Sequence, residues 1–153
     1  MDDKKLQSII TIYEKKFKDN STVYLEEEKE RNDRIDYYKS FTREKLVKID
    51  LETLTEYIGK LWSMRVWGNK EYIVSKIYTD NPHIGTQIGD LLYGKGSTEE
   101  RWDLFSDNVK GLGHAAISEL LGYIYPNDCV VFNKTTLISF EYLGVDDLPK
   151  YTY

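Results

Sequence analysis

The feature that most constrains the fold is a regular series of helix start and stop signals along the chain. Short polar side chains of the kind that cap helix N-termini stand before segments whose apolar residues recur at helical spacing. Glycine or proline follows most of these segments and is expected to end them. The start signals are Asp50, Asn69, Ser97 with Glu100, and Asn133; the stop signals are Asn81 with Pro82, Gly94, Pro126 and Gly144. This pattern predicts a mainly α, multi-helix domain.

About eight helices are expected, near 4–18, 23–40, 51–62, 70–78, 84–93, 98–109, 114–125 and 135–143. Asn20, Ser21 and Thr22 are expected to separate the first two helices. A few short strands are also expected, in the Tyr- and Val-rich stretches 22–25, 64–67 and 129–132. The last of these, C-V-V-F, is predicted to be a buried extended segment.

The length of 153 residues fits one compact domain with a single core. Residues 1–50 are interpreted as an N-terminal helical segment of unassigned role, and residues 51–153 as the region that carries the motifs. One cysteine, Cys129, two histidines and no CxxC pair exclude an internal disulfide and a zinc site, and no cofactor is expected. No long apolar run or signal-peptide pattern is present, so the expected location is cytoplasmic, without membrane contact.

The net charge of −5 counts against a protein that coats nucleic acid non-specifically, so any anion site must be local. The candidate is the G-x-G turn, Lys110, Gly111, Leu112, Gly113 and His114, which is predicted to join two helices. Glycines allow a tight turn close to a ligand, and helix N-termini attract phosphate, so this helix–hairpin–helix could hold a DNA backbone. Alternatively, the glycines serve only helix capping and helix packing.

The turn and the segments on both sides of it resemble helix–hairpin–helix DNA glycosylases over about residues 98–143. In those enzymes a G-[VIL]-G turn leads through an apolar helix and a short apolar stretch to the catalytic Asp. Ala115 stands here where bifunctional members have a Lys, and Asn133 stands where the Asp is expected. Neither side chain can perform that chemistry, so the resemblance implies the hairpin architecture without the activity. A divergent glycosylase that uses Asp128 is the enzymatic alternative.

A second resemblance covers roughly residues 55–149. It follows the order L-W…W-x-N-K-x-Y-I-V-x-K-I, L-L-Y-G, E-R-W-D-x-F, V-K-G-L-G-x-A-x-I-S-E-L-L, Y-P, F-N-K and L-G-V. This order is similar to the region ahead of the AAA+ motor in McrB-like proteins, the GTP-driven subunits of modification-dependent restriction systems. The resemblance implies a target-recognition domain for modified DNA, a motor domain in the same chain and a nuclease subunit as partners. The chain has no P-loop motif, so it is not expected to be an enzyme itself.

The segment W-S-M-R-V-W-G-N-K-E-Y, residues 62–72, is the candidate for base or second-strand contacts. Aromatic side chains stack on bases, and basic ones contact phosphate or guanine edges. The candidates here are Arg65, Trp67, Asn69, Lys70 and Tyr72, with Lys134 of F-N-K added from further along the chain. The tryptophans could instead be core residues. The leading hypothesis is therefore a non-catalytic DNA-binding domain, and the other alternative is a protein-interaction module whose G-x-G is a packing turn.

Overall fold

The computed structural model describes residues 1–18, 22–146 and 148, and over these residues the chain is helical and contains no strand. The mainly α class is confirmed, and the expected short strands are wrong. Residues 22–25 begin a helix, residues 64–67 belong to a tight turn, and residues 129–132 have no neighbouring strand with which to pair. C-V-V-F is not a buried segment either, because the side chain of Val130 is 60% exposed.

The elements lie close to where the sequence predicts them. They are α1 (Asp3–Tyr13), α2 (Thr22–Lys39), α3 (Arg43–Val47), α4 (Leu51–Gly59), α5 (Lys70–Asp80), α6 (Ile84–Tyr93), α7 (Thr98–Asn108), α8 (His114–Ile124) and α9 (Lys134–Tyr142). A π-helical turn, η1 (Glu14–Lys18), continues α1, and a 3₁₀ turn, η2 (Trp62–Met64), lies between α4 and α5. Helix α3 was not predicted. Of the residues expected to break the first two helices, Thr22 instead begins α2, and Asn20 and Ser21 lie outside the described residues.

The helix caps explain why the boundaries could be predicted. Asp50 accepts a hydrogen bond from the Thr53 amide at the start of α4, and Asn133 accepts one from the Thr136 amide at the start of α9. Ser97 and Glu100 form the expected capping box at the start of α7. Each cap gives a partner to a backbone amide that has none within its helix, which fixes where the helix begins.

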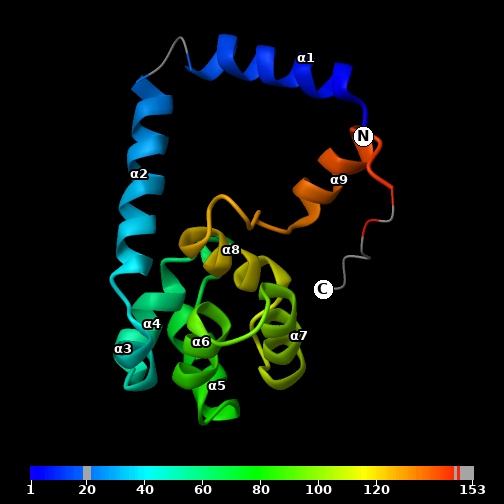
Figure 1. Cartoon of the computed structure of the whole chain (residues 1–153). Coiled ribbons are helices and arrows are strands. Elements are labelled where there is room, and N and C mark those ends of the chain that lie inside the picture. Colours follow the sequence, from blue (N-terminus) through cyan, green and yellow to red (C-terminus); the bar gives the residue numbers. More distant parts are fainter. Residues whose placement is uncertain (19–21, 147, 149–153) are drawn as a thin grey trace. The chain divides into compact units, whose positions relative to one another are not determined.

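The chain divides into two compact units, Met1–Arg34 with Phe132–Tyr153, and Ile35–Val131. In the first unit the backbone amide of Asp2 donates to the carbonyl of Leu143, which joins the start of α1 to the end of α9 (Figure 1). The second unit contains the larger core. The division expected after residue 50 falls inside this second unit, where Tyr38 and Leu46 are fully buried.

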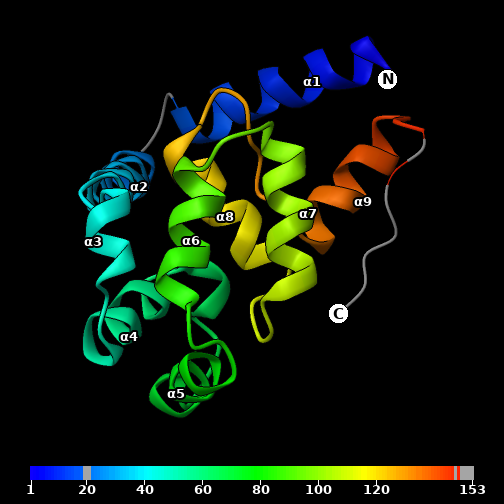
Figure 2. The ribbon, with the colours of Figure 1, turned by 60° about the horizontal axis from the view of Figure 1, so that its bottom comes forward.

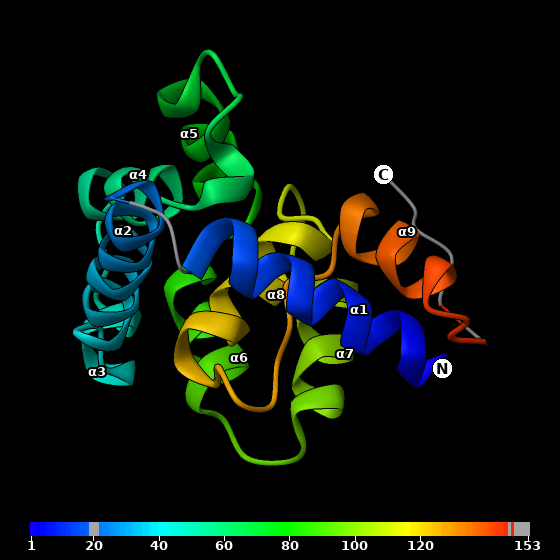
Figure 3. The same cartoon turned by 90° about the horizontal axis from the view of Figure 1, so that it is seen from above.

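Helix α6 lies at the centre of the second unit, with α3 on one side and α7 on the other (Figure 2). Helices α4 and α5 pack against each other, as the view from above also shows (Figure 3). Helix α3 approaches α6 so closely that a Cβ on Gly85 would lie 2.1 Å from the carbonyl oxygen of Leu46. Gly85 is therefore required by the packing of these two helices.

Buried tyrosines supply much of this core. The ring of Tyr38 stacks on that of Tyr123, with 4.7 Å between their centroids, and meets Tyr57 edge-on. The Tyr38 hydroxyl donates to the carbonyl of Tyr57 at 2.8 Å, and that of Tyr93 donates to the carbonyl of Phe41 at 2.9 Å. These hydroxyl groups give the core hydrogen-bonded polar atoms as well as large apolar rings.

Candidate nucleic-acid interface

The predicted turn joins α7 to α8 through Val109–Gly113. Gly111 has φ +92°, and a Cβ on it would lie 2.7 Å from Cγ1 of Ile77, so both the backbone and the packing require glycine there. Gly113 is the N-cap residue of α8, and a Cβ on it would meet no atom within 4 Å. The two glycines therefore have different roles: Gly111 packs against α5, and Gly113 leaves the start of α8 open.

The turn is held in place by Asn81, the C-cap residue of α5, which is only 3% exposed. The Asn81 side chain accepts a hydrogen bond from the Lys110 amide at 2.9 Å and donates one to the Lys110 carbonyl at 2.9 Å. It also donates to the carbonyl of Ile77 at 2.7 Å. One buried amide thus fixes the backbone of the turn on both sides of the Lys110 Cα. The sequence indicated Asn81 only as a helix stop and not as a support for the turn.

The turn exposes Lys110, Gly111 and Gly113, while the side chain of Leu112 is buried in the core. Leu112 can therefore contact a ligand only through its backbone. The ring of His114 is half-buried and lies 5.5 Å from the indole of Trp102, centroid to centroid. Gly113 provides no side-chain cap for the described first turn of α8, where helix geometry leaves backbone amides without carbonyl partners in the helix. Lys110 and these amides form the part of the turn suited to an anion.

The second candidate segment, which we call the aromatic loop, comprises Trp62–Asn69. Its tryptophans are not core residues, because Trp62 and Trp67 are about half exposed. The guanidinium of Arg65 lies over the Trp62 ring, 3.9 Å from its centroid. Tyr72, just after the loop in α5, is 66% exposed. The structure thus places Arg65, Trp67 and Tyr72 on the surface, where their side chains can stack on or pair with a ligand.

Two other predicted contact residues have structural partners instead. The side chain of Asn69 caps α5 by accepting a hydrogen bond from the Tyr72 amide at 3.1 Å. The ammonium group of Lys70 donates to the carbonyl of Gly59 at 3.0 Å and so binds the C-terminal end of α4. A cation at a helix C-terminus also stabilises the helix dipole. Both residues are therefore already used in joining α5 to its neighbours.

Glu119 is the residue that sequence reasoning missed. It lies in α8, is only 2% exposed, and its carboxylate accepts hydrogen bonds from the backbone amides of Trp62 and Ser63. The hydroxyl of Tyr123, one turn further along α8, donates to the same carboxylate at 2.7 Å. In the sequence Glu119 looks like an ordinary polar position of an amphipathic helix, and only the buried Leu120 and Leu121 beside it hint at its burial.

The turn and the aromatic loop belong to the same unit and are joined twice. Helix α5 begins directly after the loop and ends at Asn81, which holds the turn; its two cap residues are roughly 18 Å apart at 1.5 Å per residue. Helix α8 begins at the turn and carries Glu119, which holds the start of the loop, roughly 9 Å along its axis. The spacing between the two candidate segments is therefore fixed by two helices.

The remaining sequence candidates lie elsewhere. Lys134 is the first residue of α9 and belongs to the other compact unit. Asp128 lies exposed in the turn that follows α8, and its backbone amide donates to the carbonyl of Tyr125. Ala115 is the second residue of α8, and Asn133 caps α9. Burial and the nearby Asp128 raise the pKa of the Cys129 thiol, which makes it a weaker nucleophile near neutral pH.

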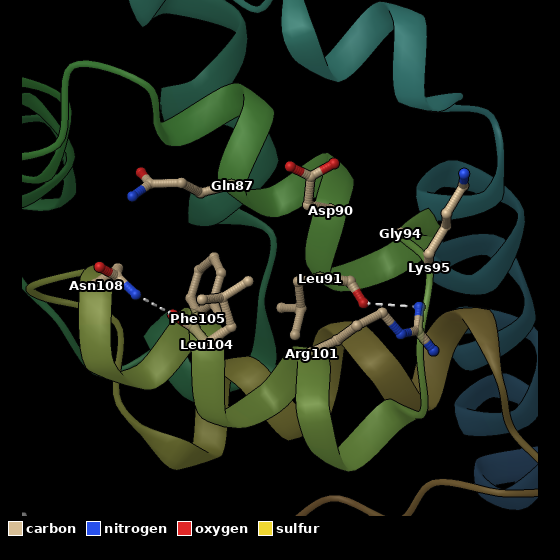
Figure 4. A pocket seen from close by; sticks show the side chains of 9 residues that line it. All are labelled: Gln87, Asp90, Leu91, Gly94, Lys95, Arg101, Leu104, Phe105 and Asn108. Atoms are coloured by element: carbon tan, nitrogen blue, oxygen red, sulfur yellow. Dashed lines mark hydrogen bonds between the residues drawn. The ribbon is translucent and has the colours of Figure 1, made fainter.

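A cavity of about 420 Å³ lies between α6 and α7 (Figure 4). Its apolar lining comes from Leu91, Leu104 and Phe105, and the carboxamides of Gln87 and Asn108 lie at one end. Of the three charged residues in its wall, Asp90 and Arg101 are paired, and Lys95 is exposed.

In that wall, Asp90 binds Arg43, and the guanidinium of Arg101 donates to the carbonyls of Leu91 and Leu92 at 2.9 Å. No three His, Cys, Asp or Glu side chains of the described residues are grouped so that they could hold a metal ion. In the same residues, no helix is both long and apolar enough to span a membrane.

Comparison with known proteins gives no matching protein family, no matching curated protein and no matching solved structure.

Proposed function

We propose that this chain is a non-catalytic DNA-binding domain whose turn Val109–Gly113 holds a backbone phosphate. The observation that carries the proposal is the form of this turn: exposed Lys110, Gly111 and Gly113, a backbone fixed by a buried Asn81, and an α8 start without a side-chain cap. Such a turn suits an anion that is recognised by charge and backbone amides, without a basic surface over the whole protein.

The aromatic loop is proposed as the second contact, through Arg65 and Trp67 with Tyr72 beside them. Exposed aromatic rings next to a guanidinium are suited to stacking on bases and pairing with phosphate. The resemblance to McrB-like restriction proteins extends this proposal. In that case the DNA would carry a modified base, and a motor domain and a nuclease subunit would act on it.

The test is a titration of labelled duplex DNA at two salt concentrations with the wild type, Gly113→Asp and Lys110→Glu. Aspartate is a favoured N-cap residue and its Cβ meets no atom within 4 Å, so Gly113→Asp should fold while its carboxylate repels phosphate. We expect each variant to weaken binding about tenfold or more and to reduce the slope of log K against log salt by about one. Lys48→Glu, the same charge change at an exposed residue elsewhere in the unit, is the matched control.

The alternatives predict different results. If both turn variants bind DNA as tightly as the wild type, the DNA contact lies on another surface of the protein. Release of a free base from damaged or methylated duplexes would identify a glycosylase. Absence of DNA binding by the wild type at low salt would reject the proposal and favour a protein-interaction module.

A further inference from the structure

We propose that Glu119 is the positioning residue of the aromatic loop, holding Trp62–Asn69 at a fixed distance from the turn so that both segments contact the same DNA. The inference rests on the proposed DNA-binding function and adds to it the group that orders its second contact. Glu119 does not itself face solvent and touches no ligand, since it is only 2% exposed. It acts through the backbone of the loop.

The geometry of the carboxylate carries this inference. One oxygen accepts from the Trp62 amide and from the Tyr123 hydroxyl, and the other accepts from the Ser63 amide at 2.9 Å. Two successive amides at the start of a 3₁₀ turn thus share one bidentate acceptor. A buried carboxylate is costly unless several donors surround it, and here all three donors are fixed by the fold.

The other anchors of the loop are two apolar side chains and one helix cap. Leu61, just before the loop, and Met64, within it, are buried, and Asn69 at its end caps α5, while Arg65, Val66 and Trp67 lie exposed. The two buried apolar side chains hold the loop against the core, but apolar contacts are not directional and do not fix its orientation. The two hydrogen bonds from the loop amides to Glu119 fix the orientation of the loop. Their acceptor lies in α8, the helix that begins at the turn. Loss of the carboxylate should therefore loosen the loop and leave the turn unchanged.

Glutamine is the informative substitution at this position. Glu119→Gln keeps the size of the side chain but replaces one acceptor oxygen by an NH₂ group that would face a backbone amide. We expect Glu119→Gln to bind duplex DNA about fivefold to tenfold more weakly, close to the loss expected for Trp67→Ala. Tyr123→Phe, which removes the hydroxyl and keeps both bonds from the carboxylate to the loop, is the matched control and should bind like the wild type.

A merely structural role is distinguished by a double-variant cycle. If Glu119 acts by placing the loop, Trp67→Ala combined with Glu119→Gln should lose less than the product of the two single losses, because both changes act on the same contact and only the part made by Arg65 remains to be lost. A combination of Glu119→Gln with Lys110→Glu should show the product of the two losses, because the turn is a separate contact. Losses that multiply in the first pair would contradict the positioning role.

A second measurement does not depend on DNA, and its first part uses only the wild type. In the wild type, the amide hydrogens of Trp62 and Ser63 should exchange slowly with solvent although the loop is exposed, because Glu119 accepts from both. In Glu119→Gln they should exchange at least tenfold faster, while the Asn81 amide keeps its rate. Fast exchange in the folded wild type overturns the role of Glu119, whereas absence of DNA binding by the wild type overturns the proposed function.

Discussion

At the scale of single residues, two buried polar side chains hold the two exposed segments of the candidate interface. Asn81 holds the turn through both the amide and the carbonyl of Lys110, and Glu119 holds the aromatic loop through two amides. Neither side chain can contact a ligand, since both are almost fully buried. Both connect groups that lie far apart in the sequence, so each contributes to the position of an exposed segment.

Replacement of Asn81 by alanine should destabilise the second unit and release the turn. The substitution leaves the Lys110 amide without its acceptor in a partly buried place and removes two further hydrogen bonds. We expect a loss of about 1–3 kcal/mol in the free energy of unfolding, measured by urea denaturation. Asn108→Ala is the control, because Asn108 is exposed and bonds only to the carbonyl of Leu104 in its own helix. Equal effects of the two substitutions would contradict the role given to Asn81.

At the scale of elements, the close packing of α3 on α6 decides the shape of the second unit's core. Gly85 lets the backbone of α6 approach the carbonyl of Leu46, and Leu46 itself is fully buried. Arg43, at the start of α3, binds Asp90 of α6 at 2.6 Å and joins the same two helices at the surface. That ion pair is almost half exposed and contributes little, so the contact depends mainly on packing.

Gly85→Ala should therefore be strongly destabilising even though alanine favours helices. The added Cβ would lie 2.1 Å from a backbone oxygen, which cannot move without displacing α3. We expect a loss of about 3 kcal/mol, at the upper end of the range for overpacking. Gly59→Ala in α4 is the matched helical control, where the new Cβ would lie 3.8 Å from the Lys70 side chain. That change should be neutral or stabilise by up to about 1 kcal/mol. Thermal unfolding followed by circular dichroism measures both, and a tolerated Gly85→Ala would mean that α3 packs less closely.

At the scale of the whole molecule, the buried tyrosines make the free energy of unfolding depend on pH in the alkaline range. The chain has 13 tyrosines. Burial raises the pKa of Tyr38 and Tyr57 far above the ordinary value, and burial together with the Glu56 carboxylate raises the pKa of Tyr37 to about 12. In the unfolded chain these phenols ionise near pH 10. The folded state therefore holds their protons more tightly than the unfolded state does.

This difference predicts a loss of stability as pH rises above about 10. The contribution of these groups is complete below the unfolded pKa and declines as pH rises toward the folded pKa, about 12 for Tyr37. Tyrosinate absorbance followed together with helical circular dichroism measures the transition. The buried group should ionise only as the helices unfold. Ionisation of every tyrosine near pH 10 with the helices intact would contradict the buried ring cluster.

Much of the fold could be predicted from local signals. Caps such as Asp50 and Ser97, and stops such as Pro82 and Gly94, act within one helical turn, so they are visible in the sequence. Helix α3 was missed because its cap, Thr42, introduces only one and a half turns of helix, too short for a periodic pattern. The expected strands failed because Val- and Tyr-rich residues fit helices and turns as well when no neighbouring strand is present.

The sequence by itself determined most of the helices, their order and the glycine turn, because these depend on residue type and short-range spacing. The tertiary structure alone decided which glycine is required by packing, which tryptophans are exposed, and that Asn81 and Glu119 support the two candidate segments. These properties depend on contacts between residues far apart in the chain, 29 positions for Asn81 with Lys110 and 56 for Glu119 with Ser63. Local spacing carries no information about such pairs, since they form only when the helices pack.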